Sequence, residues 1–252
     1  MPTFTMNVFR GDARGGDFKA YRVEADPGMV VLDVIHRIQA TQATDLAVRW
    51  NCKAGKCGSC SAEIDGKPRL MCMTRMDLFK EGEPISVAPI RGFPAIRDLV
   101  TDVSYNYEKA RQVPPLRIKP PEPDGTYRMM QEDIDRIQEF HKCIECFLCQ
   151  DVCHVIRDHD TKPVFAGPRF FIKLASLEMH PLDTRDRLEA IRREAGLGLC
   201  NITKCCTEVC PEHIHITDNG IIPLKERVVD EFFDPVVWLL RKLRGAPKAP
   251  PS

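Results

Sequence analysis

The stretch Cys143-Ile-Glu-Cys146-Phe-Leu-Cys149-Gln-Asp-Val-Cys153 decides the fold of the second half of this 252-residue chain. Its four thiols are separated by two, two and three residues. This spacing is typical of iron–sulfur ligands, in which the first three cysteines hold one cluster and the fourth holds a second. A zinc site would more often use two separated Cys-x-x-Cys pairs or a Cys/His mixture, and a disulfide knot is the other alternative. The run predicts iron–sulfur binding, and it requires another cysteine group to complete both clusters.

That other group is Cys200-Asn-Ile-Thr-Lys-Cys205-Cys206-Thr-Glu-Val-Cys210. The same spacing calls for cysteine at its first, fourth, seventh and eleventh places, and Thr203 occupies the fourth. Thr is a poor iron ligand beside thiolates, so we expect one iron position to be vacant. The predicted [4Fe–4S] ligands are Cys143, Cys146, Cys149 and Cys210, and the predicted [3Fe–4S] ligands are Cys153, Cys200 and Cys206.

This spacing assigns no cluster to Cys205. Because it adjoins Cys206, we expect its side chain to point elsewhere. The alternative is that Cys205 is a spare ligand that converts the three-iron cluster to four irons.

A third group, Cys52-Lys-Ala-Gly-Lys-Cys57-Gly-Ser-Cys60, is followed by Cys72. The spacing C-x4-C-x2-C with a distant fourth cysteine is the plant-type [2Fe–2S] pattern. Gly55 and Gly58 suit it, because backbone amides must turn toward the cluster sulfurs and glycine reaches the required angles without a Cβ clash. A chance cluster of structural thiols is the alternative. The predicted [2Fe–2S] ligands are Cys52, Cys57, Cys60 and Cys72.

The residues around this group predict a β-grasp layout. Alternating apolar residues at 4–8 and the segment 18–24 predict two strands joined by a turn at 10–17, and helical periodicity predicts a helix over about 30–41. Between Cys60 and Cys72, Asp65-Gly66 predicts a hairpin turn. A closing strand is expected near residues 85–87.

Helices dominate the prediction beyond residue 92. An amphipathic helix is expected within 92–110, with Ile96, Leu99, Val100 and Val103 on one face. Five prolines between residues 113 and 123 predict a stiff, extended connector, which either fixes the distance between two redox domains or straps a surface. Further helices are predicted at 131–140, at 167–180, and from Asp183 to about Ala195.

Composition excludes several classes of protein. Lys+Arg and Asp+Glu both number 36, and this neutral balance argues against nucleic-acid binding. Twelve cysteines in tight groups indicate metal rather than scattered disulfides. We expect no signal peptide and no transmembrane segment, because the N-terminus lacks the required pattern and no apolar run approaches 18 residues.

The three cysteine groups in this order resemble the iron–sulfur subunit of succinate dehydrogenase and fumarate reductase, over roughly residues 1–230. The resemblance implies an α+β chain with an N-terminal β-grasp plant-type [2Fe–2S] ferredoxin domain and a C-terminal all-α bacterial-type two-cluster ferredoxin domain. It also implies a flavoprotein partner with FAD, and a membrane-anchor partner where a quinone receives electrons near the [3Fe–4S] cluster.

The chain departs from the family pattern beside the last cluster. His154 stands where many members have Pro, and Asn201 stands where many have His. Both residues are candidates for the quinone pocket, for menaquinone or ubiquinone, although His154 is also compatible with a solvated or supporting role. His213 and His215 are expected to be structural.

The expected domains are 1–108 (β-grasp, with a trailing helix), 109–128 (connector), 129–233 (helical) and 234–252 (a basic amphipathic helix and a disordered tail). The helix at 234–244 is expected to contact a partner or the membrane interface. The chain is expected to be peripheral, on the cytoplasmic face of the cell membrane, within a complex. Two other functions stay open: the same subunit in a quinol:fumarate reductase, and a free-standing electron carrier.

Overall fold

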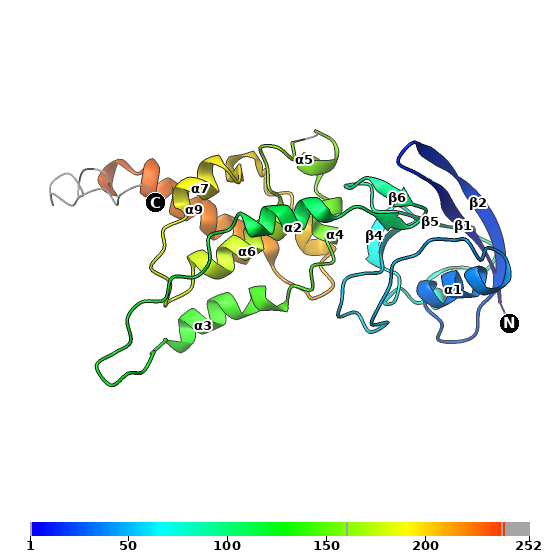
Figure 1. Ribbon diagram of the computed structural model, residues 1–252, viewed down its shortest axis with the longest axis horizontal. Helices are drawn as coiled ribbons and strands as arrows, with labels where there is room; N and C mark the ends of the chain where they lie inside the picture. The colour runs from blue at the N-terminus through cyan, green and yellow to red at the C-terminus, as the bar shows by residue number, and fades with distance from the viewer. Residues whose placement is uncertain (1, 160, 238, 240–252) are drawn as a thin grey trace.

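The computed structural model describes residues 2–159, 161–237 and 239, and it is elongated, with a sheet at one end and helices at the other (Figure 1). The N-terminus lies at the sheet end and the last described helices lie at the opposite end. Strands come first along the chain and helices follow, so the predicted α+β class is confirmed.

The first half is built on a five-stranded mixed sheet. Its strands are β1 (Thr3–Asp12), β2 (Gly15–Glu24), β3 (Ser61–Ile64), β4 (Lys67–Leu70) and β5 (Ile85–Ala88). Their order across the sheet is β2-β1-β5-β3-β4, with β5 parallel to β1 and the other pairs antiparallel. Helix α1 (Val31–Thr41) buries its apolar stripe in the core under this sheet, and a short 3-10 helix, η1 (Met76–Leu78), precedes β5. The predicted β-grasp layout is therefore confirmed.

The first two strands are longer than predicted. β1 and β2 pair from Thr3–Glu24 to Asp12–Gly15, so the predicted turn at 10–17 is wrong and only residues 13–14 connect the strands. Glycine permits this close pairing: a Cβ on Gly11 would stand 2.4 Å from the carbonyl oxygen of Gly15.

The prediction of a helix within 92–110 is wrong for the residues before 104. Residues 95–101 form a small hairpin of β6 (Ala95–Arg97) and β7 (Val100–Thr101), and helix α2 (Ser104–Arg111) follows. The hairpin turns at Asp98, whose φ is 48° and whose buried carboxylate accepts N–H groups from Gly11 and Ala47 at 3.1 and 2.9 Å. These long-range hydrogen bonds override the helical periodicity of the segment.

The predicted connector covers residues 109–128. Residues 109–111 are the last of α2, and residues 112–130 contain no helix or strand, as the prolines predict. The part from 114 to 119 is hydrogen-bonded to residues 182–184 and 187: Lys119 donates to the carbonyl of Leu182 at 2.9 Å, and Thr184 donates to the carbonyl of Arg117 at 2.9 Å. This part of the connector is therefore strapped over the helical half.

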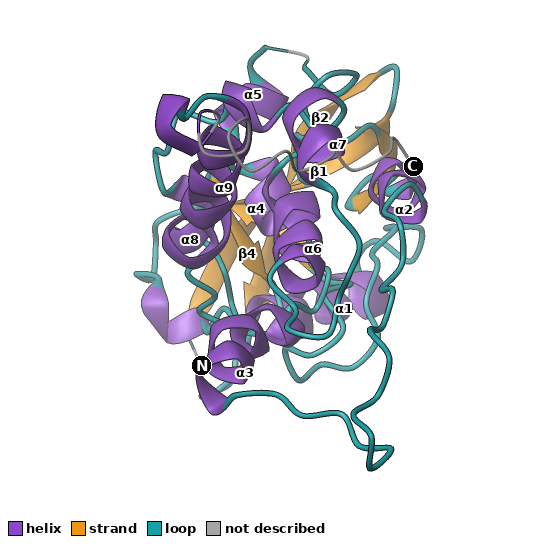
Figure 2. Cartoon of the chain, turned by 90° about the vertical axis from the view of Figure 1, so that its left-hand side faces the viewer, coloured by secondary structure: helices purple, strands orange, loops and turns teal. Residues whose placement is uncertain are grey.

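Short helices form the second half, and α6 lies at their centre (Figure 2). The α-helices are α3 (Gln131–Gln138), α4 (Leu148–Asp151), α5 (His154–Arg157), α6 (Pro168–Glu178), α7 (Leu188–Arg193), α8 (Cys205–Glu208) and α9 (Ile222–Phe232). The 3-10 helices η2 (Glu139–Lys142) and η3 (Leu197–Leu199) and the π-helical segment η4 (Ile216–Ile221) complete it. Phe171 and Leu174 of α6 are buried, which confirms the predicted core stripe of this helix.

The helix predicted from Asp183 begins five residues later, at Leu188. The Asp183 carboxylate accepts the N–H groups of Arg117 and Arg185 at 3.0 and 2.9 Å and forms a 2.7 Å ion pair with Arg187. Asp183 thus anchors the connector instead of starting a helix.

Most of the predicted C-terminal basic helix, residues 238 and 240–252, lies outside the described residues. The described part begins as predicted, because the Asp234 carboxylate accepts the N–H groups of Val236 and Val237 at 2.7 and 3.1 Å. No helix within the described ranges is long and apolar enough to cross a bilayer.

Candidate iron–sulfur sites

The first cysteine group lies in the loop between α1 and β3, with N–H groups directed at its thiols. The amide of Ala54 donates to Cys52 Sγ at 3.3 Å. Cys72 follows the β3–β4 hairpin, and its amide donates to Cys60 Sγ at 3.4 Å. The structure thus brings together the four residues of the predicted [2Fe–2S] set, Cys52, Cys57, Cys60 and Cys72.

Two thiols of this group differ strongly in pKa. Burial raises the pKa of Cys60 to about 12. Burial acts in the same direction on Cys57, but hydrogen bonds from Ser59 and from the Cys52 amide outweigh it and lower its pKa to about 6. The loop can therefore hold negative charge at its exposed side, and a bound metal would supply the compensation that the buried side needs.

The second set lines a small cavity in the helical half. The cysteines that line it are Cys143, Cys146, Cys149 and Cys210, which form the predicted [4Fe–4S] set. The rest of the lining is mainly apolar and includes Ile172, Ile214 and Ile216. Burial raises the pKa of Cys146 to about 12, so this thiol needs a metal to become a thiolate. Four cysteines around one mainly apolar cavity are the donor set that a cubane cluster requires.

The third set gathers beside the second. The pKa values of Cys153 and Cys206 are raised to about 11, mainly by burial, and the charges of Cys205 and Cys200 contribute to the rise. The three predicted [3Fe–4S] ligands are thus close together. Thr203, in the predicted vacant position, lies in the same loop.

The prediction that Cys205 points away from this set stays a prediction. The Cys205 Sγ lies 3.3 Å from the hydroxyl oxygen of Thr203, and its charge contributes to the raised pKa values of Cys153 and Cys206. Lys204, with φ of 63°, turns the backbone just before α8.

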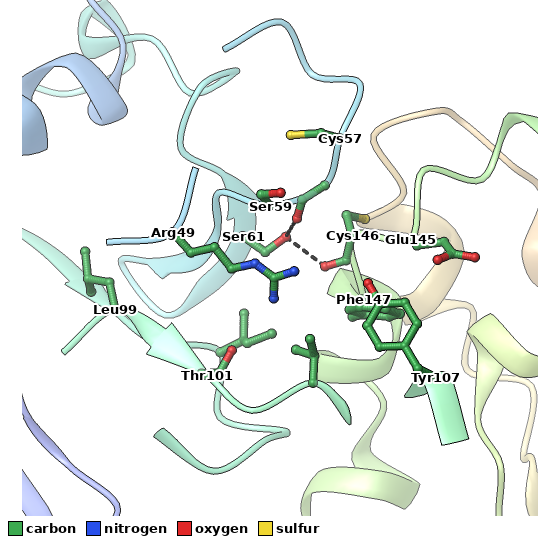
Figure 3. Close-up of a pocket in the computed structure, with 13 residues that line it drawn as sticks. Arg49, Cys57, Ser59, Ser61, Leu99, Thr101, Tyr107, Glu145, Cys146 and Phe147 are labelled. Carbon is green, nitrogen blue, oxygen red and sulfur yellow. Dashed lines mark hydrogen bonds between the residues drawn. The ribbon is translucent and has the colours of Figure 1, made fainter. Parts of the chain in front are cut away.

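The first and second sets meet through backbone atoms (Figure 3). Ser61 donates a hydrogen bond from its hydroxyl to the carbonyl of Cys146 at 2.7 Å, and its oxygen lies 3.1 Å from the carbonyl of Gly58. Lys56 also forms a 3.0 Å ion pair with Glu212, which lies two residues after Cys210 of the second set. The loop of the first set is thereby fastened to two segments of the second set.

The second and third sets also adjoin. Burial raises the pKa of Cys149 well above its ordinary value, and the charge of Cys206 adds to the rise. The three sets therefore form a continuous series, in which the first set contacts the second and the second adjoins the third.

A cluster places its own iron and sulfide atoms between its thiolates, so its ligands stand farther apart than those of a single ion. Among the described residues, no group of three or more His, Cys, Asp or Glu side chains is arranged to hold a metal ion.

Two family models match the chain: a 2Fe-2S iron-sulfur cluster binding domain over residues 5–108, and a 4Fe-4S dicluster domain over residues 139–214. The fumarate reductase iron-sulfur subunit of Mycobacterium tuberculosis is 35% identical over 205 residues, which are 78% of this chain and 80% of that protein. The chain belongs to the iron–sulfur subunits of succinate dehydrogenase and fumarate reductase.

Members of this family with the other name are also similar. The succinate dehydrogenase iron-sulfur subunit of Bacillus subtilis is 30% identical over 192 residues, 71% of each chain. A chain in the structure titled "Mycobacterium smegmatis Sdh1 complex in the apo form" is 64% identical, with a TM-score of 0.90 over 93% of this chain and 99% of that chain. The comparisons confirm the family and its two ferredoxin-type domains, and they do not separate succinate dehydrogenase from fumarate reductase.

In this iron–sulfur subunit, the two candidates for the quinone pocket touch each other. Asn201 Nδ2 lies 2.8 Å from His154 Nε2, and each residue directly follows a cysteine of the third set. His215, predicted to be structural, pairs with Glu139 at 2.6 Å and helps to anchor η4.

Sequence reasoning missed Ser61 and Arg169. Ser61 directly follows Cys60 and belongs to no recognised motif. Its hydroxyl bonds to the carbonyl of Cys146, which lies 85 residues later in the chain. Arg169 lines the cavity of the second set from α6, a helix whose pattern indicated only a core stripe. Neither residue type has a characteristic spacing relative to the cysteines, so only the tertiary structure reveals them.

Proposed function

We propose that this chain is the electron-transfer subunit of a succinate:quinone oxidoreductase. Electrons pass singly from the FAD of a flavoprotein partner through [2Fe–2S], [4Fe–4S] and [3Fe–4S] clusters to a quinone in the membrane. The observation that carries the proposal is the continuous series of cysteine sets, joined first at Gly58 and Cys146 and then at Cys149 and Cys206.

The proposed ligands follow these sets. Thiolates are soft ligands suited to iron–sulfur clusters, and buried sets with few competing donors favour them over harder metals. Thr203 in place of a fourth thiolate supports a three-iron cluster at the end of the series, with Cys205 nearby but not assigned as a ligand. The ligand sets are Cys52, Cys57, Cys60 and Cys72; Cys143, Cys146, Cys149 and Cys210; and Cys153, Cys200 and Cys206.

Clusters of three types suit the task of linking a two-electron donor to a quinone. Each cluster exchanges one electron, and cluster type, net charge, hydrogen bonds and exposure set its potential. The protein fixes the spacing of the first two cysteine sets, because Ser61 bonds to Cys146 and Lys56 pairs with Glu212.

The proposed quinone end is the pair His154 and Asn201, beside the third set. A neutral imidazole and a carboxamide both offer hydrogen bonds to a quinone oxygen, either menaquinone or ubiquinone. A membrane-anchor partner would complete this pocket, and the chain would lie peripherally on the cytoplasmic face of the cell membrane. The proposed domain limits are 1–108, 109–128, 129–233 and 234–252.

A quinol:fumarate reductase is the second candidate, because the similar protein of M. tuberculosis carries the name fumarate reductase. The same series of clusters can carry electrons in either direction. The reduction potentials of the clusters and of the quinone decide between succinate oxidation and fumarate reduction.

The test is purification from the native membrane, with iron and sulfide analysis and potentiometric EPR. The proposal expects a flavoprotein and a membrane subunit to co-purify with this chain, together with three distinct EPR centres. A three-iron centre well below the potential of the fumarate couple would count against succinate oxidation. Isolation only as a soluble holo-monomer would instead support a free-standing carrier.

A further inference from the structure

Arg169 lines the cavity of the second cysteine set. It is the second residue of α6, and its side chain is only 11% exposed. Among the described residues that line this cavity, Arg169 carries the only positive charge; Glu212 carries a negative charge and is paired with Lys56. A buried guanidinium beside four cysteines requires an explanation, because isolated charges are costly in apolar surroundings.

The hydrogen bonds of Arg169 are incomplete within the protein. Its terminal Nη2 pairs with the carboxylate of Glu145. Its Nε is buried and has no partner among the described residues. An unsatisfied buried N–H is rare and unfavourable, so an acceptor is expected inside the cavity. The sulfur atoms of a cluster or of its thiolates are the acceptors that this cavity would contain.

The N-terminus of α6 approaches the same cysteines. Gly167 precedes the helix with φ of 88°, and a Cβ on it would stand 2.0 Å from the side-chain oxygen of Gln150, the residue after Cys149. The eleven-residue helix therefore directs the positive end of its dipole at the cysteine run. Glycine is required there for the close approach.

Glu145 does not cancel the charge of Arg169 at the cavity. Its side chain is 43% exposed, so water screens the carboxylate, whereas the guanidinium is nearly enclosed. Arg169 is therefore the enclosed positive charge of this lining, and Glu212, whose side chain is 16% exposed, is its enclosed negative charge.

We propose that Arg169 tunes the [4Fe–4S] cluster, donating its Nε–H to cluster sulfur and raising the reduction potential of that cluster. This inference rests on the proposed function, in which the cavity holds this cluster. When the cluster accepts one electron from the [2Fe–2S] cluster, the total charge in the cavity becomes one unit more negative. A fixed positive charge and an N–H donor stabilise that reduced state more than the oxidised state, and no proton transfer is needed.

The experiment measures the potential of each cluster by EPR in the intact, membrane-derived complex with Arg169→Gln, Arg169→Lys and Glu145→Gln. At the potential where the wild-type [4Fe–4S] cluster is half reduced, less of it is reduced in Arg169→Gln and more in Glu145→Gln. Arg169→Lys gives a smaller shift than Arg169→Gln, because it keeps the charge and loses the fork of N–H donors. The other two clusters keep their potentials.

The opposite signs of the two charge variants separate tuning from mere packing. A purely structural Arg169–Glu145 pair would make both variants behave alike, and that result would overturn the inference. Arg128→Gln is the matched control, since Arg128 is 74% exposed and also pairs with a carboxylate, Asp124. We expect the cluster potentials of the Arg128→Gln complex to equal those of the wild type.

Two further outcomes are distinguishable. A wild-type complex without a [4Fe–4S] signal contradicts the proposed function itself. A wild-type complex with this signal, and an unchanged potential in Arg169→Gln, contradicts only the role of Arg169. If Arg169→Gln loses the cluster, the signs of the shifts in Arg169→Lys and Glu145→Gln decide the question.

Discussion

A Cβ atom on Gly58 would stand 2.6 Å from Cα of Cys146, which lies 88 residues later in the chain. It would also stand 2.8 Å from the Cys146 nitrogen and from the Ile144 carbonyl oxygen. All these neighbours are backbone atoms and cannot move as a side-chain end can. Gly58 is therefore required twice, for its φ of 64° and for the contact between the first two cysteine loops.

We expect Gly58→Ala to slow electron transfer between the first two clusters, because the loops must separate to admit the methyl group. Freeze-quench EPR after rapid mixing with succinate would show the [2Fe–2S] cluster reduced before the [4Fe–4S] cluster. The left-handed conformation adds about 1–2 kcal/mol of destabilisation.

Gly66→Ala is the control for this effect. Gly66 also has a left-handed backbone, with φ of 69°, but a Cβ there meets nothing within 4 Å. It should lose similar stability and keep the wild-type electron-transfer rate. Equal rates in the two variants would show that the loop contact has no part in transfer.

Arg187 holds the connector to the helical half. It is 2% exposed, forms a 2.7 Å ion pair with Asp183, and donates to the carbonyls of Pro114 and Pro115 at 3.0–3.1 Å. Arg187→Ala leaves a buried carboxylate and two carbonyls without this partner, so we expect a loss of about 3–5 kcal/mol of unfolding free energy. Hydrogen exchange of the connector would report it.

The exposed pair of Arg193 and Glu189, at 2.6 Å, gives the comparison. Arg193→Ala should change the unfolding free energy by only about 0–1 kcal/mol. Comparable losses in the two variants would contradict a special role for the buried network.

Glu178 should make stability depend on pH. Burial, with the charge of Asp186, raises its pKa from 4.5 to about 7 against the opposing influence of Arg187. Between these two values the folded chain keeps the proton and the unfolded chain releases it, so the free energy of unfolding falls as pH rises from about 4.5 to 7. Thermal unfolding of Glu178→Gln at pH 5 and pH 8 should show the variant gaining stability relative to wild type at the higher pH.

The matched variant for this experiment is Glu189→Gln, since the Glu189 side chain is 52% exposed. Its difference from wild type should be nearly the same at both pH values. A Glu178→Gln difference that is independent of pH would show that this carboxyl titrates normally.

Thr203→Cys should convert the three-iron centre to a four-iron centre and slow quinone reduction, because a fourth thiolate completes the vacant position. Iron quantitation and EPR of the assembled complex would measure the conversion. An unchanged three-iron signal in a correctly assembled variant would contradict the ligand assignment.

Cys205→Ser serves as the companion variant, since Cys205 lies 3.3 Å from Thr203. If Cys205 is not a ligand, its removal leaves the iron count of the third centre unchanged. A lower count would identify Cys205 as a ligand.

The spacing of the cysteines was enough to predict iron–sulfur binding, because a cluster requires particular donor atoms at particular intervals, and the order of the three groups carried the resemblance to the family. Alternating and helical periodicity likewise predicted β1, β2, α1 and α6, because strand and helix place neighbouring residues of the chain on one face at fixed intervals. Such features are visible in sequence since each depends on neighbouring residues.

The tertiary structure alone decided features that depend on contacts across long stretches of chain. Asp98 replaced a predicted helix with a hairpin by bonding to Gly11 and Ala47, and Asp183 became an anchor for the connector instead of a helix start. The placement of Arg169 beside a cavity lined by cysteines has no periodic signal. The chemistry of such residues comes from burial and from partners that only folding brings near, which is why the cysteines could be predicted and the residues that position and surround them could not.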